Sequence, residues 1–239
     1  MIEPLVTVQG LVKNYQALRP LRVESLIVNR RDVISITGLD APAAEMFVGL
    51  LTGAVLPDAG EIRLFGKSTS EVADSDAWLA MLDGVGIVTD RAVLISQFTV
   101  EQNIAMPFTL EVDPVAAAMR PRVRQLAEEV GLGGDDLHTP VAQASPHVQA
   151  RVRLARAVAL EPSVLFAEHP SATLARDTVK AFAADVRRVA GARGLAVLAI
   201  TADEVFASAL GGHVLVHEPV SGALKPRRGW SRMFRVLRD

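Results

Sequence analysis

The chain has 239 residues, of which half are hydrophobic, and its 25 basic and 27 acidic side chains leave a net charge of −2. Such a length suits one domain with a sizeable core, and the near-balanced charge argues neither for nor against a nucleic-acid partner. The sequence contains no cysteine, which excludes disulfides and thiolate metal sites. The N-terminal segment shows no basic stretch followed by an apolar one, so we expect no secretion signal.

The first part of the chain predicts a β-rich region that encloses one helix. β-branched residues with partial alternation predict the strands, and a longer apolar run before a turn at Pro57–Gly60 predicts the helix. The predicted strands are Leu5–Val8, Leu21–Val28, Asp32–Ile36 and Glu61–Phe65, and the predicted helix is Ala43–Thr52.

From residue 70 onward, predicted helices alternate with strands. His138–Gln149 is polar, carries two prolines and is predicted to be a loop. The short apolar runs Val164–Ala167 and Ala196–Thr201 are typical of buried parallel strands. The other predicted elements are helices at Ser70–Leu82, Val100–Met106, Val115–Val130, Ala150–Ala159, Thr178–Ala190 and Val205–Leu210, and strands at Gly84–Val88, His213–His217 and Ala223–Lys225. This order favours an α/β sheet with a helical insertion at about residues 91–150.

Three stretches carry a resemblance to a known family: "GLLTGAVLPDAGEIRLFG" (Gly49–Gly66), "FTVEQNIAMP" (Phe98–Pro107) and "RVRLARAVALEPSVLFAEHPSATL" (Arg151–Leu174). With these stretches in order, the chain from Leu5 to Lys225 resembles the nucleotide-binding subunit of ATP-binding cassette (ABC) transporters. The resemblance implies a P-loop NTPase-like cassette of the α/β class. Such a cassette has an antiparallel β subdomain, a mostly parallel core sheet and a helical subdomain, and residues 1–239 would form a single ATP-binding domain.

One segment aligns with the family's phosphate-binding loop but keeps only its first glycine. A working loop reads G-x-x-G-x-G-K-[ST]-[ST], in which the glycines admit the phosphates, the lysine neutralises them and the hydroxyl ligates Mg²⁺. The matched nucleotide-binding positions are Gly38, Ala43, Ala44, Glu45 and Met46. Alanine replaces the lysine, and Pro42 has no N–H to donate. We hypothesise that Glu45, in the first helical turn, caps the helix and repels a triphosphate; the simpler interpretation is a favourable first-turn residue.

The other family motifs have changed as well. Asp90 aligns with the glutamine that contacts Mg²⁺, Glu168 with the Walker B aspartate, His169 with the catalytic glutamate, Ala202 with the switch histidine, and Ala144–Val148 with the signature motif. Asp90 is a candidate metal ligand, although an isolated acid near a turn is more often solvated surface. His169 is a candidate general base, with a surface or interface histidine as the alternative.

Tyr15, the only tyrosine in the chain, falls where the family places an aromatic ring that stacks on adenine. Stacking alone contributes roughly 1–3 kcal/mol, which corresponds to an affinity weaker than about 1 mM. The alternative is that the ring packs over the first sheet.

The C-terminal segment Lys225–Asp239 predicts a basic amphipathic helix, with Trp230, Met233, Phe234 and Leu237 on one face. Such a segment can lie on an anionic membrane surface. Packing on its own domain or on a partner subunit is the alternative.

The resemblance with its lost motifs implies a degenerate ATP-binding subunit of an ABC-type transporter complex, structural or regulatory, without hydrolysis of its own. Two alternatives stay open: a divergent ATPase that uses Asp90, Glu168 and His169, and a free-standing regulatory scaffold. We expect no cofactor, with ATP and Mg²⁺ bound weakly or not at all. The expected partners are a transmembrane permease subunit and a second cassette, another chain or a copy of itself, and no nucleic acid. The expected location is cytoplasmic, peripheral on the inner face of the membrane, with residues 225–239 as the membrane contact.

Overall fold

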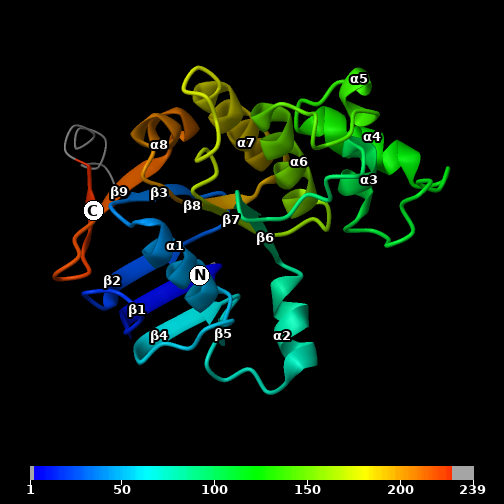
Figure 1. Cartoon of the computed structure of the whole chain (residues 1–239). Coiled ribbons are helices and arrows are strands. Elements are labelled where there is room, and N and C mark those ends of the chain that lie inside the picture. The colour runs from blue at the N-terminus through cyan, green and yellow to red at the C-terminus, as the bar shows by residue number, and fades with distance from the viewer. Residues whose placement is uncertain (1–2, 228–239) are drawn as a thin grey trace.

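The computed structural model describes residues 3–227, which form two β-sheets with helices between and above them (Figure 1). In this part of the chain, one sheet has the order β2-β1-β4-β5 and is antiparallel. The other has the order β10-β9-β3-β8-β7-β6 and is parallel except for its edge strand β10. The fold class predicted from the sequence, a mixed α/β architecture with an antiparallel part and a mostly parallel core sheet, is confirmed.

The strands are β1 (Val6–Lys13), β2 (Leu21–Val28), β3 (Val33–Thr37), β4 (Ala59–Leu64), β5 (Lys67–Ser68), β6 (Val85–Thr89), β7 (Val164–Glu168), β8 (Ala196–Ile200), β9 (His213–His217) and β10 (Leu224–Pro226). The helices are α1 (Ala41–Leu51), α2 (Ser75–Leu82), α3 (Val100–Ala105), α4 (Arg120–Glu129), α5 (Gly134–Leu137), α6 (Pro146–Val158), α7 (Val179–Arg193) and α8 (Glu204–Leu210).

The central strands of the parallel sheet separate two hydrophobic cores. Side chains on a strand alternate between faces, so in β7 Val164 and Phe166 pack with α1 and the antiparallel sheet, whereas Leu165 and Ala167 pack with the helices above. Figure 1 shows this layering, with α1 between the two sheets and α6, α7 and α8 on the opposite face of the parallel sheet. The short apolar runs in the sequence are apolar throughout because both faces of these strands are buried.

The helical region predicted near residues 91–150 contains α3, α4 and α5, which follow β6 in the chain and lie to one side of the parallel sheet (Figure 1). Two helix starts in and next to this region differ from the prediction. α6 begins at Pro146, inside the predicted loop, because the Ser145 hydroxyl accepts the Val148 N–H at 3.3 Å and caps the helix. α4 begins at Arg120 rather than Val115, which instead forms an isolated β-bridge with Val112.

Within residues 3–227, none of the helices combines the length and the apolar character needed to cross a bilayer. Of the predicted C-terminal amphipathic helix, Lys225 and Pro226 belong to β10, Arg227 follows it, and the remainder lies outside the described residues. Lys225 pairs with Glu218 at 3.0 Å.

Candidate functional site

The parallel sheet brings most of the predicted site residues to one edge. The carboxyl ends of parallel strands meet at the same edge of a sheet, where open α/β folds bind ligands. Here β3 leads into Gly38 and the loop before α1, β6 leads into Asp90, and β7 ends at Glu168. This edge is therefore the candidate site.

The loop after β3 is short because α1 begins early. Asp40 is the N-cap of α1, its side chain accepts the Ala43 N–H at 2.9 Å, and Pro42 occupies the first turn. Glu45 consequently lies in the second turn, so the hypothesis that Glu45 caps the helix from its first turn is wrong. The cap is Asp40, a residue that the sequence reasoning passed over although aspartate just before an apolar helix is a common N-cap.

The early start of α1 also changes where the matched loop positions point. Ala44, at the family's lysine position, is completely buried in the core with α1, and Ala43 is 5% exposed. Met46 is partly buried against the same core. Apart from Gly38 and Glu45, the matched positions thus face the interior of the protein.

Arg91 joins two of the acidic positions into one cluster. Its guanidinium binds Glu168 through two bonds, Nε to Oε1 at 3.0 Å and Nη2 to Oε2 at 2.6 Å, and binds Glu45 Oε1 through Nη1 at 2.6 Å. Glu168 is 3% exposed, whereas the Arg91 and Glu45 side chains are half exposed. We call these three residues the Arg91 clamp.

The pKa of Arg91 lies above its usual value, chiefly through its hydrogen bonds to Glu168 and further through the charges of Glu168, Glu45 and Asp90. Sequence reasoning missed Arg91, whose only signal is that it follows Asp90 directly. Asp90 itself is partly buried in the turn after β6. Within the described part of the chain, it belongs to no group of three or more carboxylates and histidines that could hold a metal ion.

His169 and Ala202, matched to the catalytic glutamate and the switch histidine, lie next to each other. The His169 N–H donates to the Ile200 carbonyl at 2.8 Å, and its Nδ1 accepts the Ala202 N–H at 3.4 Å. The backbone of His169 has a φ of 40°, a left-handed conformation that costs about 1–3 kcal/mol in a non-glycine residue. Among the described residues its Nε2 is buried and finds no hydrogen-bond partner.

Beside His169 is a cavity of about 630 Å³, whose lining includes Ser171, Ala202 and Asp203. The Ser171 hydroxyl donates to Asp203 Oδ2 at 2.8 Å. Asp203 Oδ1 in turn caps α8 by accepting the Val205 and Phe206 N–H groups. Asp203 therefore connects the loop after β7 to the start of α8. The hydroxyl hydrogen of Ser171 is already donated to it.

Tyr15 lines a second cavity of about 510 Å³ together with Gly38, Asp40 and Ala43. The ring is half-buried and packs against the core that contains α1 and the antiparallel sheet. Burial raises the pKa of Tyr15, and the nearby Asp40 charge raises it further. The ring thus both packs on the core and borders the cavity.

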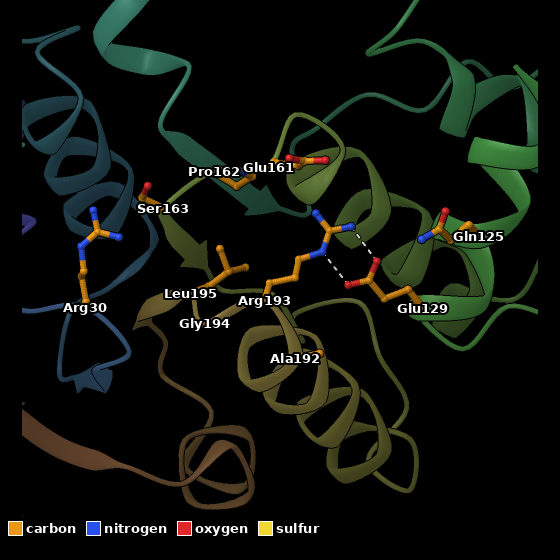
Figure 2. Close-up of a pocket in the computed structure, with 10 residues that line it drawn as sticks. All are labelled: Arg30, Gln125, Glu129, Glu161, Pro162, Ser163, Ala192, Arg193, Gly194 and Leu195. Carbon is orange, nitrogen blue, oxygen red and sulfur yellow. Dashed lines mark hydrogen bonds and ion pairs between the residues drawn. The ribbon is translucent and has the colours of Figure 1, made fainter.

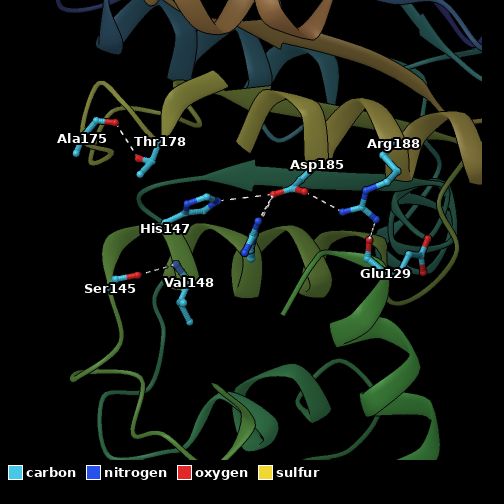
Figure 3. A network of polar contacts seen from close by, with 9 residues as sticks. Glu129, Ser145, His147, Val148, Ala175, Thr178, Asp185 and Arg188 are labelled. Carbon is cyan, nitrogen blue, oxygen red and sulfur yellow. Dashed lines mark hydrogen bonds and ion pairs between the residues drawn. The ribbon is translucent and has the colours of Figure 1, made fainter. Parts of the chain in front are cut away.

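The segment matched to the signature motif borders a polar network between α6 and α7, shown in Figure 3. Asp185 on α7 accepts from Arg151 at 2.9 Å and from Arg188 at 2.8 Å, and His147 Nε2 lies 3.7 Å from it. Burial and the Arg151 charge lower the pKa of His147, and Asp185 opposes them by less. His147 is therefore mainly neutral near pH 7. Its ring packs edge-on to Phe182, with 6.4 Å between the ring centroids.

A further cavity of about 570 Å³ lies at the opposite end of the parallel strands, where Ser163 precedes β7 and Leu195 precedes β8 (Figure 2). Arg193 in its wall binds Glu129 through two bonds of 2.5 and 2.6 Å. Glu161, in the same wall, adds its charge beside Arg193, but none of the residues matched to the family motifs lines this cavity.

The fold is that of an ATP-binding cassette. The dimeric cassette MJ0796 bound to ADP and Pi superposes with a TM-score of 0.74 at 20% identity, covering 93% of this chain and 97% of that one. The cbiO1 protein from Clostridium perfringens, part of the ABC transporter complex cbiONQ, gives a TM-score of 0.72 at 20% identity and covers 93% of this chain and 87% of that one.

Sequence comparison gives the family. Residues 44–172, more than half of the chain, match the family model for "ABC transporter". The lipoprotein-releasing system ATP-binding protein LolD 2 of Caulobacter vibrioides is 32% identical over 208 residues, 84% of this chain and 89% of that protein. The methionine import ATP-binding protein MetN of Brucella abortus is 30% identical over 198 residues, 83% of this chain but 53% of MetN, so the chain spans about half of that relative. This chain belongs to the ABC transporter family.

Proposed function

We propose that this chain is an ATP-binding-cassette subunit of a transport complex that has kept the fold and lost ATP hydrolysis. The relatives are named as ATP-binding proteins of methionine import and lipoprotein release, which supports a role in a transport complex without giving its cargo. The loss of hydrolysis rests on the residues of the site.

The Arg91 clamp is the observation that supports the proposal most strongly. Phosphoryl transfer depends on cations placed around the phosphates, supplied in this family by Mg²⁺ and a lysine. In this chain the acidic residue at the Walker B position is already neutralised by a guanidinium of the same chain, at 2.6 Å. Glu45 and Asp90 add negative charge to the same edge of the sheet, where a triphosphate would be repelled.

The start of α1 does not fit a phosphate-binding loop. Helix N-termini bind phosphate through free N–H groups. Here Asp40 takes the Ala43 N–H, Pro42 has none, and the carboxylate of Asp40 lies where an anion would approach. Ala44 is buried and carries no charge. The site therefore offers MgATP neither a lysine at position 44 nor a set of free backbone N–H groups at the start of α1.

We propose a transmembrane subunit as a partner, docked on a groove of about 380 Å³ beside the loop after β6. Leu79, Ile87 and Leu160 in its wall are 54%, 38% and 55% exposed, an apolar content typical of interaction surfaces. Such a chain would sit at the cytoplasmic face of the membrane and pair with a second cassette, either another chain or a copy of itself.

A loop-replacement variant tests the loss of nucleotide use. Asp40→Gly and Pro42→Gly remove the cap and the proline, and Ala41→Gly and Ala43→Gly weaken the first turn of α1, so that the helix can begin later and position 44 can leave the core. Ala44→Lys and Glu45→Ser then supply the cation and the hydroxyl, and Arg91→Gln frees Glu168. We expect no saturable MgATP binding by the wild-type chain and measurable binding by the variant. Hydrolysis of MgATP by the wild-type chain that is abolished by Glu168→Gln would instead support the divergent ATPase.

Association separates a transporter subunit from a free-standing scaffold. We expect the full chain to co-purify with an integral membrane protein in detergent and to lose it when Leu79, Ile87 and Leu160 are replaced by serine. Leu110→Ser, at an apolar side chain that is 88% exposed and is not among the residues lining the groove, is the control. Purification of the chain without any membrane protein would favour the scaffold.

A further inference from the structure

The segment of residues 90–99 joins the parallel sheet to the helical region, because it runs from the end of β6 to the start of α3 (Figure 1). The chain leaves α5 and reaches α6, which packs on β6, through residues 138–145. Any movement of α3, α4 and α5 relative to the sheets must therefore be accommodated at these two connections. The first connection contains Arg91.

This segment is held from the sheet side by the Arg91 clamp. Arg91 binds the segment to Glu168 at the end of β7 and to Glu45 on α1. These two partners lie 77 and 46 positions from Arg91 in the chain. The anchor is Glu168, because its carboxylate is buried and accepts two charge-assisted hydrogen bonds from one planar guanidinium. The bond to half-exposed Glu45 adds less.

The same segment is also held by α6, which contacts β6 of the sheet as well as α3 and α4. Arg153 Nε donates to the Ala92 carbonyl at 3.1 Å, and Arg156 Nη1 donates to the Val93 carbonyl at 2.7 Å. Three successive residues, Arg91, Ala92 and Val93, are thus fixed between β7 and α1 on one side and α6 on the other. Arg153 and Arg156, with Ala92, also form part of the wall of the proposed docking groove.

We propose that Arg91 is an internal cation that locks this segment in place, so that the helical region and the docking groove keep one arrangement without a bound nucleotide or metal. The guanidinium is part of the chain and remains charged at all physiological pH values, so its occupancy does not depend on nucleotide concentration. The inference deepens the proposed function and rests on it, because a cassette that no longer cycles with ATP needs another means of holding its partner surface.

Hydrogen exchange of the full chain, followed by mass spectrometry, tests the lock. The Arg91 and Ala92 amides donate to Thr89, and the Ile95 amide donates to Asn103, so they report on the segment. The double variant Arg91→Gln, Glu168→Gln removes both charges of the buried pair, so that neither is left unpaired. In this variant we expect hydrogen exchange in residues 90–98 to rise about tenfold, while exchange in β1 and β2 is unchanged. Arg63→Gln, which breaks a surface pair with Glu61, is the control and should change nothing in this segment.

Arg91→Lys keeps the charge but loses the planar fork, and we expect an intermediate rise in exchange for it. Exchange within twofold of wild type in a folded Arg91→Lys variant, or in the double variant, would overturn the lock. The two proposals fail differently. If the wild-type chain binds MgATP and hydrogen exchange in residues 90–98 is the same with and without the nucleotide, the proposed function alone is contradicted. Unaltered exchange in the Arg91 variants, with no MgATP binding, contradicts the lock alone.

Discussion

Replacing Arg91 by methionine should destabilise the protein substantially, because it leaves the buried Glu168 carboxylate without its counter-charge. Breaking a buried ion pair by removing one partner costs about 3–5 kcal/mol. Glu168 is 3% exposed but Arg91 is half exposed, so water screens part of the charge and we expect a loss of about 3 kcal/mol. For a chain of this size that corresponds to a fall in Tm of about 6–12 °C.

Urea denaturation followed by circular dichroism gives the free energy of unfolding for each variant. Arg91→Met with Glu168→Gln removes the buried charge as well, and should recover stability relative to Arg91→Met alone. Glu45→Gln, at the exposed end of the clamp, should cost about 0–1 kcal/mol. A loss below about 1 kcal/mol for Arg91→Met, or no recovery in the double variant, would refute the assignment of Arg91 as the counter-charge of Glu168.

Three other predictions concern the caps and the shifted pKa values. The absorbance of Tyr15, the only tyrosine, should titrate with a pKa above 10, and Asp40→Asn should lower that pKa while keeping the cap; an unchanged midpoint would argue against their proximity. Asp40→Ala, which removes the cap of α1 as well, should cost about 1 kcal/mol in a urea titration, and Asp40→Asn much less. Because the pKa of His147 is lowered in the folded chain, its contribution to stability is present above its ordinary pKa of about 6.5 and is lost as the pH falls through that value and below. The free energy of unfolding of His147→Gln should therefore fall less than that of wild type between pH 7 and pH 5.

The layers of the fold could be predicted from the sequence because buried strands and helices have recognisable patterns of apolar residues. β7 and β8 are buried on both faces and are apolar throughout, and α7 has the apolar period of a helix. β1 continues to Lys13, five residues beyond the predicted strand, and several helices begin at other residues than predicted. At two of these helix starts one side chain decides. Ser145 starts α6 inside a predicted loop, and Asp40 starts α1 two residues before the predicted helix.

The clamp was not predictable, because its partners are distant in sequence. Glu45 and Glu168 were both singled out, but only the fold places them on either side of Arg91. Local pattern reasoning treats a charge after a turn as solvated surface. The same limit explains why Ala44, matched to a lysine position, could not be recognised as a core residue until the start of α1 was known.

The most direct test of the loss of nucleotide use is calorimetric titration of MgATP into the purified full-length chain. With Asp40 capping α1 and Arg91 neutralising Glu168, we predict no saturable binding tighter than about 1 mM. The loop-replacement variant, run alongside, shows that the assay detects a working site in this fold. Saturable binding of MgATP by the wild-type chain at about 10 μM or tighter, with release of phosphate, would contradict the account.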